Sequence, residues 1–299
     1  MHNEFDKEKV ISVVKRTFTD VTVNDDIKLE RMGGLTNRTY KVILESKNVV
    51  VRLPGEGTEE LINRYDEKHS TELACKIGID AHLYMFDEST GIKITEYIES
   101  SKTMSPETMR EDKNIVLAAK LLYKLHNCGY DTGVQFDVIN MAENYEKIIK
   151  ANNVSLYKDY EDVKQFIRKI QQDYLLNVKK VPCHNDPLCE NWILKDSKDM
   201  YLIDWEYAGM NDPMWDLADL SIEGNYDSKN DELLLESYFN KKPGKEEFKA
   251  FLINKVLIDY LWSLWGKTRV PYDGDIMEAY AFHRYIRMKE SIKNLDLVV

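Results

Sequence analysis

The sequence predicts an α+β protein built from two lobes of unlike composition. Short apolar runs rich in Val, Ile and Leu, separated by turn residues, fill the chain up to Ile98, whereas helical periodicity dominates afterwards. The length of 299 residues is also typical of two domains or of one large two-lobed molecule. We therefore expect a small N-terminal lobe at 1–98 and a larger, mainly helical C-terminal lobe at 99–299.

The first lobe is predicted to hold an antiparallel sheet and one helix. Gly33-Gly34 and Ser46-Lys47-Asn48 separate successive β-type runs and are typical of the tight turns of a meander. Helical spacing of apolar residues, with Gly78 as a stop signal, predicts the helix. The expected strands are 28–32, 38–44, 49–53, 82–86 and 92–96, and the expected helix is 59–77.

The second lobe is predicted to be helical apart from one hairpin. Ser105-Pro106 is a helix start signal, and the later segments carry apolar residues at helical spacing. The hairpin joins 192–194 to 200–203 through a polar turn, and we expect its ends to project toward the junction of the lobes. The expected helices are 106–127, 141–151, 160–177, 215–223, 231–239, 245–266 and 277–295.

Composition and charge exclude several classes of protein. With 41 basic and 52 acidic residues the net charge is −11, so the chain would repel a nucleic acid. An acidic surface suits a small cation, although acidity that serves solubility alone is the simpler explanation. We find no secretory signal and no apolar run of the roughly 18 residues that span a membrane, so we expect a cytoplasmic protein. The cysteines show neither a zinc nor a disulfide pattern: Cys75, Cys128, Cys183 and Cys189.

The chemically most informative stretch runs from His184 to Asn191 and is followed by Ile-Asp-Trp-Glu at 203–206. An Asn on a loop and a carboxylate at the end of the next strand offer oxygen ligands, which Mg²⁺ prefers, so we predict Asn191 and Asp204 as metal ligands. Asp186 is then free to accept the proton of a substrate hydroxyl in phosphoryl transfer, with His184 beside it in the catalytic group. Taken singly, each of these residues could equally be a cap or a turn former.

The combined pattern resembles a known superfamily. His-x-Asp, an Asn five residues after the Asp, and a hairpin ending in Ile-Asp-Trp-Glu resemble the catalytic core of the choline/ethanolamine kinases and aminoglycoside phosphotransferases. The resemblance extends over nearly the whole chain, from Gly33 to Tyr285, and bacterial choline kinases match best. It implies a two-lobed, protein-kinase-like fold, with ATP and Mg²⁺ as cofactors and a small cationic alcohol as phosphate acceptor.

The resemblance assigns nucleotide-binding roles to the first lobe. Arg52 stands on the third strand, where kinases carry a phosphate-binding lysine, although a solvated strand arginine is the alternative. The following helix should offer Arg52 a carboxylate partner, for which Glu67 is the better match and Glu72 the competitor. Glu96 and Ile98 would bind adenine through their backbone. The loop that covers the phosphates would use Gly34, Thr36 and Asn37.

Several residues of the second lobe resemble the substrate site of choline kinases. Trp262 and Trp265, three apart on one helical face, would enclose a quaternary ammonium group, which is recognised by aromatic faces and a nearby carboxylate. From spacing alone the pair would more simply belong to the core. Asp216 would brace the catalytic loop through hydrogen bonds. The other substrate-binding residues that the resemblance implies are Glu206, Tyr207, Glu223 and Tyr280.

Together these features predict an ATP-dependent choline kinase that forms phosphocholine. Asp186 would act as the base, and Arg52 with the metal ligands would hold the ATP phosphates. An ethanolamine or aminoglycoside kinase stays open because those substrates are also cationic alcohols. A catalytically silent nucleotide-binding regulator stays open because a fold does not fix a function. The sequence leaves the oligomeric state and the number of Mg²⁺ ions undetermined.

Overall fold

The chain divides into two compact units in a computed structural model that describes residues 2–20, 27–33, 37–55, 57–58 and 61–296. The first unit comprises Met1–Met104 and Glu190–Ala208, and the second comprises Ser105–Cys189 and Gly209–Val299. This division differs from our boundary after residue 98 because the hairpin pairs with a strand at Ser101–Thr103 and joins the first unit. The assignment of nucleotide binding to residues 1–98 and of catalysis and substrate binding to residues 99–299 stays a prediction. Among the described helices, none is both long and apolar enough to cross a membrane.

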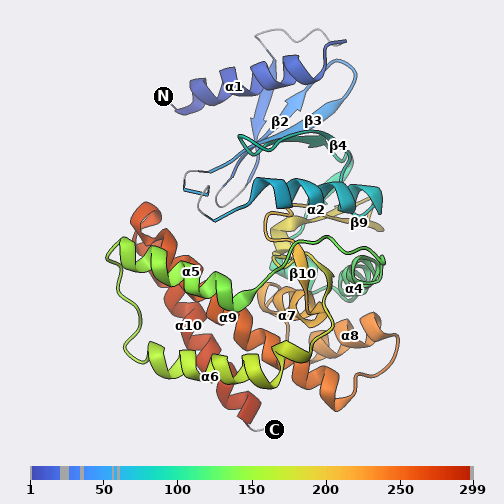
Figure 1. Cartoon of the computed structure of the whole chain (residues 1–299). Coiled ribbons are helices and arrows are strands. Elements are labelled where there is room, and N and C mark those ends of the chain that lie inside the picture. The colour runs from blue at the N-terminus through green and yellow to red at the C-terminus, as the bar shows by residue number, and fades with distance from the viewer. Residues whose placement is uncertain (1, 21–26, 34–36, 56, 59–60, 297–299) are drawn as a thin grey trace. The chain divides into compact units, whose positions relative to one another are not determined.

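The first unit is built around a five-stranded sheet (Figure 1). Its order is β1-β2-β3-β5-β4, and every neighbouring pair of strands is antiparallel. The helix α1 (His2–Thr17) lies across one face, and its residues Val10 and Val14 share one buried core with Val42 and Val51 of the sheet. The strands are β1 Lys28–Arg31, β2 Arg38–Ile43, β3 Asn48–Leu53, β4 Leu83–Asp87 and β5 Ile92–Glu96.

A helix and a second, three-stranded sheet complete the first unit. The helix α2 (Arg64–Lys76) begins at Asn63, whose side chain accepts hydrogen bonds from the first backbone N–H groups of the helix. The predicted hairpin is present, and its register pairs Trp192 with Leu202. Leu202 N donates to Ile79 O at 2.9 Å, which ties the hairpin to the segment after α2. The strands of this sheet are β6 Ser101–Thr103, β8 Trp192–Lys195 and β9 Asp199–Leu202.

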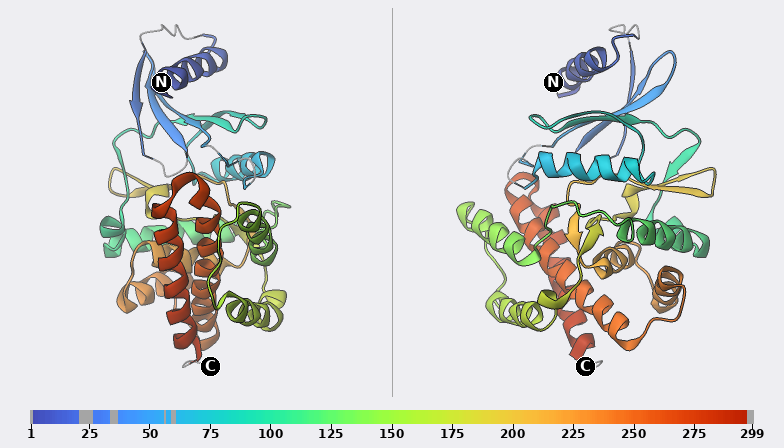
Figure 2. Two further views of the ribbon diagram at one scale, coloured as in Figure 1. Left: turned by 90° about the vertical axis from the view of Figure 1, so that its left-hand side faces the viewer. Right: turned by 45° about the vertical axis from the view of Figure 1, so that its right-hand side comes forward.

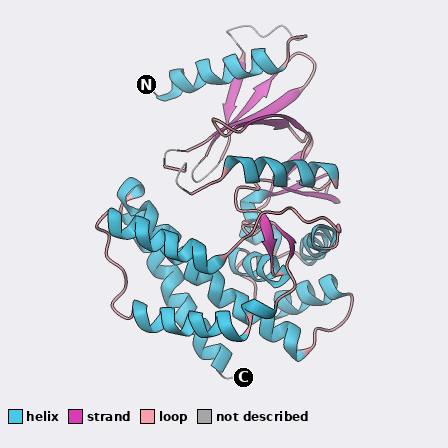
Figure 3. Cartoon of the chain, in the orientation of Figure 1, coloured by secondary structure: helices cyan, strands magenta, loops and turns pink. Residues whose placement is uncertain are grey.

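The second unit is mainly helical (Figures 2 and 3). The helices α9 (Lys245–Asp273) and α10 (Asp275–Asp296) run side by side, and α7 (Pro213–Glu223) packs against α9. The strands β7 (Val181–Cys183) and β10 (Gly209–Asn211) form a short antiparallel pair, and the loop that contains His184 and Asp186 follows β7. The other elements are α3 Pro106–Met109, α4 Asp112–His126, α5 Val138–Ala151, α6 Tyr160–Asp173, η1 Leu175–Asn177, η2 Cys189–Asn191, α7 Pro213–Glu223 and α8 Ser228–Phe239.

The predicted elements are present with a few local differences. The helix predicted at 106–127 is two helices, because Arg110 ends α3 and Glu111 begins α4. The helix predicted to end at residue 266 continues to Asp273. Our patterns do not predict α1, β6, β7 or β10. The three strands have three residues each, and their pairing depends on partners far along the chain.

Candidate active site

Arg52 lies at the centre of a buried ion cluster in the first unit. Its strand β3 is flanked by β2 and β5, and its guanidinium binds the carboxylate of Glu67 on α2 through two hydrogen bonds, of which Nη2 to Oε2 measures 3.0 Å. Arg64 Nη1 donates to the same carboxylate at 2.7 Å. The structure therefore confirms Glu67, and not Glu72, as the partner of Arg52.

Two carboxylates at the end of the hairpin extend this cluster. Arg52 Nη1 lies 3.2 Å from Asp204 Oδ1 and 3.1 Å from Glu206 Oε1. Burial disfavours ionisation of Glu67, but the attraction of the neighbouring cations outweighs it and lowers the pKa of Glu67 to about 2. Burial and the nearby Asp204 raise the pKa of Glu206. One oxygen each of Glu67, Asp204 and Glu206 lie within 4.8 Å of one another, and the cations Arg52 and Arg64 balance part of their charge.

A cavity of about 160 Å³ in the first unit adjoins the ion cluster. Arg52, Lys93 and Asp204 line it together with Glu96 and Ile98, the two residues predicted to bind adenine. Apolar walls with a few convergent polar groups are typical of small-molecule sites and suit a flat base with an anionic tail. The apolar side chains of the wall include Val50, Ala81, Ile193 and Ile203.

The structure brings the two predicted metal ligands together. Ile203 N donates to the carbonyl oxygen of Asn191 at 2.9 Å, so the chain at Asn191 lies beside the residue that precedes Asp204. Asp204 has a φ of 71°, a left-handed conformation that residues other than glycine rarely adopt and that is common at functional sites. An amide and a partly exposed carboxylate supply oxygen donors. This donor set fits Mg²⁺.

In the second unit, the loop after β7 carries His184 and Asp186. The carboxylate of Asp216 on α7 accepts the backbone N–H of His184 at 2.8 Å and that of Asn185 at 2.7 Å. Trp215 Nε1 donates to Asn185 O at 3.0 Å, and Asn185 has a left-handed φ of 67°. The bracing role predicted for Asp216 is confirmed.

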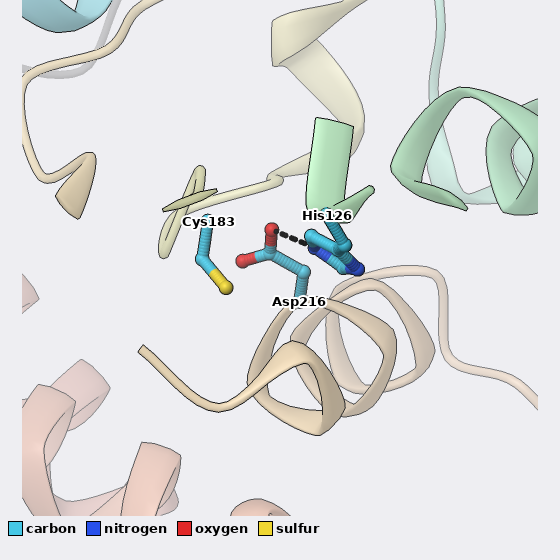
Figure 4. Close-up of side chains that lie close together, drawn as sticks. All are labelled: His126, Cys183 and Asp216. Atoms are coloured by element: carbon cyan, nitrogen blue, oxygen red, sulfur yellow. Dashed lines mark hydrogen bonds and ion pairs between the residues drawn. The ribbon is translucent and has the colours of Figure 1, made fainter. Parts of the chain in front are cut away.

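Figure 4 shows Asp216 with the neighbouring side chains of His126 and Cys183. His126 Nε2 lies 3.0 Å from Asp216 Oδ2, and its Nδ1 lies 2.8 Å from the hydroxyl of Tyr238. Cys183 lies on the other side of Asp216, and burial together with that carboxylate holds the pKa of its thiol well above the usual range. Because Asp216 already accepts hydrogen bonds from the loop after β7 and lies 3.0 Å from His126 Nε2, we interpret His126, Cys183 and Asp216 as a structural support.

Three rings of α9 and α10 form an aromatic cluster, defined by Trp262, Trp265 and Tyr280. The ring centroids of Trp262 and Trp265 are 6.1 Å apart, those of Trp265 and Tyr280 are 5.8 Å apart, and both pairs meet edge to face. Arg284 Nε donates to the Tyr280 hydroxyl at 3.1 Å, and the same guanidinium forms an ion pair with Glu223 of α7. Four residues predicted to bind substrate therefore belong to one connected group.

Two predicted site residues have surroundings that differ from their predicted roles. His184 is fully buried, and its Nδ1 accepts the Asp186 N–H at 3.3 Å, so it orders the loop, while its catalytic role stays a prediction. We predict Glu206 as a substrate ligand, but its carboxylate binds Arg64 at 2.6 Å and also Arg52. A buried histidine and a buried ion pair both look like exposed functional groups in the sequence alone.

The remaining predicted site residues of the first unit are Gly34, Thr36, Asn37 and Tyr207. Gly34 and Thr36 lie outside the described residues. Asn37 is buried, and its Oδ1 accepts the Gly55 N–H at 3.3 Å, which orders the chain beside the predicted phosphate loop. Tyr207 is half-buried in the first unit, and its contribution to substrate binding stays a prediction.

The sequence patterns miss three residues of the site. Lys93 pairs in register with Arg52 and lies 3.5 Å from Glu67, so a second cation faces the cavity. Arg64 completes the ion cluster. Asp219 lies on α7 between Asp216 and Glu223 and is fully buried. Acidic residues at helical spacing in an otherwise apolar helix were the available signal for Asp219.

Comparison with known proteins identifies the family. The model of the choline/ethanolamine kinase family matches residues 29–267. Protein LicA of Haemophilus influenzae is 30% identical over 270 residues, covering 86% of this chain and 78% of that protein. A choline/ethanolamine kinase family protein from Mesorhizobium loti has a TM-score of 0.83 at 32% identity and covers 100% and 99% of the two chains. The choline kinase LicA from Streptococcus pneumoniae has a TM-score of 0.81 at 32% identity and covers 95% and 98%. The predicted kinase-like α+β fold is therefore confirmed, and the chain belongs to the choline/ethanolamine kinase family.

Proposed function

We propose that this protein is an ATP-dependent choline kinase, which transfers the γ-phosphoryl group of ATP to the hydroxyl of choline. The observation that carries the proposal is the aromatic cluster of Trp262, Trp265 and Tyr280 with Glu223 connected to it. A quaternary ammonium group has no N–H to donate and no proton to lose, so aromatic faces and negative charge are the groups that select it. Choline kinase relatives at about 30% identity support the same substrate.

The residues of the loop and the hairpin have distinct roles in this proposal. Asp186 accepts the proton of the choline hydroxyl as the oxygen attacks the γ-phosphorus, and Asp216 keeps the loop that carries Asp186 in place. Asn191 and Asp204 hold Mg²⁺, which neutralises charge on the β- and γ-phosphates when bound. His184 orders the loop from within through its hydrogen bond with Asp186 N.

The first unit binds the nucleotide. Arg52 is held by Glu67, which leaves the guanidinium fixed at the wall of the cavity beside Lys93, where two cations face the phosphates. Glu96 N donates to His82 O at 2.8 Å within the sheet, so we assign its carbonyl oxygen to the adenine amino group and the N–H of Ile98 to the ring. A solved structure of LicA in complex with AMP, 31% identical to this chain, supports nucleotide binding. Because ATP is the cofactor, we expect a cytoplasmic location.

Ethanolamine is the second candidate substrate. A probable ethanolamine kinase of Arabidopsis thaliana is 28% identical over 94% of this chain, so the family likeness alone does not separate the two alcohols. A primary ammonium group, however, needs several hydrogen-bond acceptors, and the cluster offers mainly aromatic faces. A spectinomycin phosphotransferase shares the fold with a TM-score of 0.61 at 13% identity, which gives no support for an aminoglycoside substrate. Retention of Asp186, Asn191 and Asp204 argues against a silent regulator.

The proposed function is tested by measuring ADP release with ATP and Mg²⁺ while choline, ethanolamine and a panel of aminoglycosides are offered at matched concentrations. We expect choline to give the highest kcat/KM and phosphocholine as the product. A higher kcat/KM for ethanolamine or an aminoglycoside would identify that compound, and not choline, as the substrate. The absence of turnover with every alcohol would favour the nucleotide-binding regulator.

A further inference from the structure

The carboxylate connected to the aromatic cluster is already neutralised by protein cations. Glu223 forms an ion pair with Arg284, whose Nη1 also donates to Asp259 Oδ1 at 3.1 Å. Arg287 binds the same Asp259 through two hydrogen bonds of 2.6 and 2.7 Å. Two carboxylates and two guanidinium groups form a balanced chain, so Glu223 has little net charge left for a cationic substrate.

Asp219 is a second carboxylate on the same side of α7, and it lacks this compensation. It lies four residues before Glu223 and three after Asp216, spacings that place all three side chains along one helix face. Its residue is fully buried, and neither carboxylate oxygen receives a hydrogen bond from the part of the chain that the structure describes. Through Asp216, which holds the loop of Asp186, and through Glu223, this face connects the catalytic loop to the aromatic cluster.

A buried carboxylate without a partner is costly unless a cation or a proton compensates it. Burial is the main cause that raises the pKa of Asp219 well above the usual range; the nearby carboxylates Glu223, Asp186 and Asp216 add to this effect, and Arg284 opposes it. With no cationic ligand beside it, burial therefore favours the protonated form of this carboxyl group. A permanently charged ammonium group near it would favour the ionised form, and such an attraction acts over several ångströms without direct contact.

Trp265 gives a second observation that points to a ligand at this place. Its indole Nε1–H is buried and has no hydrogen-bond partner among the described residues, although its ring contacts both Trp262 and Tyr280. Buried indole N–H groups usually find a partner. The aromatic cluster therefore contains a hydrogen-bond donor without a partner among the described residues, and α7 carries a carboxylate without one four residues before Glu223.

We propose that Asp219 is the carboxylate that balances the positive charge of the choline head group and sets the preference of this protein for a cationic over an uncharged alcohol. This inference rests on the proposed choline kinase function and adds a specificity-determining residue to it. Glu223, held by Arg284, shapes the site, whereas Asp219 supplies the charge.

The test compares choline with 3,3-dimethylbutan-1-ol, an uncharged alcohol of nearly the same shape, in the wild type and in Asp219→Asn at saturating ATP and Mg²⁺. We expect kcat/KM for choline to fall about 30-fold in the variant, mainly through KM, because the attraction of one charge at an intermediate dielectric is lost. The loss for the uncharged alcohol should be at least tenfold smaller. Asp173→Asn, an exposed change of the same charge in the second unit, serves as the matched control.

Unfolding temperature is the second readout. Removing a buried carboxyl that has no partner should leave the melting temperature of the ligand-free protein unchanged or higher, whereas a purely structural Asp219 would lower it. Should the Asn variant fail to fold, Asp219→Ala provides the same comparison of the two alcohols. Equal losses for both alcohols, or an unchanged preference for choline, would overturn the inference while wild-type choline turnover stands. Absence of choline turnover in the wild type would overturn the proposed function and this inference with it.

Discussion

Replacing Asp216 by Asn tests whether the catalytic loop depends on one buried carboxylate. Its two oxygens accept hydrogen bonds from His184 N at 2.8 Å, Asn185 N at 2.7 Å and His126 Nε2 at 3.0 Å. Asn retains one acceptor oxygen and presents an NH₂ group to the remaining donors, so at least one buried donor loses its partner. Hydrogen bonds to a charged group contribute about 1.5–3 kcal/mol each, and breaking a buried charged network costs about 3–5 kcal/mol.

We therefore expect Asp216→Asn to lose about 4 kcal/mol of stability and roughly 10 °C in melting temperature, given about 2–4 °C per kcal/mol for a domain of this size. Displacement of Asp186 by about 1 Å should lower kcat by about 10²-fold. Thermal unfolding and steady-state kinetics measure the two effects, with Asp173→Asn as the control. A variant that keeps the melting temperature and kcat of the wild type would refute the assigned brace.

Three further predictions concern the two units separately. Trp262→Ala should reduce kcat/KM for choline at least about tenfold more than for ethanolamine, since cation–π attraction is worth about 2 kcal/mol in a desolvated site; equal losses would indicate a structural tryptophan. Because the pKa of Glu67 is lowered to about 2, the stability that ionised Glu67 contributes is complete above its ordinary pKa and is lost as the pH falls toward 2. Glu67→Gln should therefore make the melting temperature less dependent on pH in that range and weaken ATP binding. An unchanged dependence of the melting temperature on pH would contradict the ion cluster. Asp80 is buried in the wall of the cavity of the first unit, and burial raises its pKa to about 7. Ionisation of Asp80 therefore destabilises the fold as the pH rises toward 7, so the melting temperature of Asp80→Asn relative to that of the wild type should increase between pH 5 and pH 8. A constant difference would contradict burial as the cause.

Patterns confined to neighbouring residues predicted the fold well. The hairpin at β8 and β9 follows from two short apolar runs around a polar turn, and its strands end within one residue of the predicted bounds. The short strands β7 and β10 are not predictable in this way, because each gains its partner only in the folded chain. The helix α1 carries Val10, Val13 and Val14 at helical spacing, a signal that was available in the sequence.

The roles of site residues could be predicted where a sequence motif determines their chemistry. They could be predicted less well where the role depends on whether the side chain is buried. The partner of Arg52 had two candidates in sequence, and the geometry of α2 selects Glu67. The predicted roles of His184 and Glu206 differ from their surroundings because a motif does not show which side chains are buried. The absence of a hydrogen-bond partner at Asp219 becomes visible only when the packing around α7 is known.

In the proposed reaction Asp186 takes the proton from choline during phosphoryl transfer, and the turnover of Asp186→Ala measured beside its ATP affinity tests this role most directly. Loss of general-base help should lower kcat at least about 10²-fold, while the dissociation constant for ATP stays close to that of the wild type. Asp173→Asn should keep full turnover. Retention of more than about a tenth of the wild-type kcat by Asp186→Ala would contradict the assignment of the base.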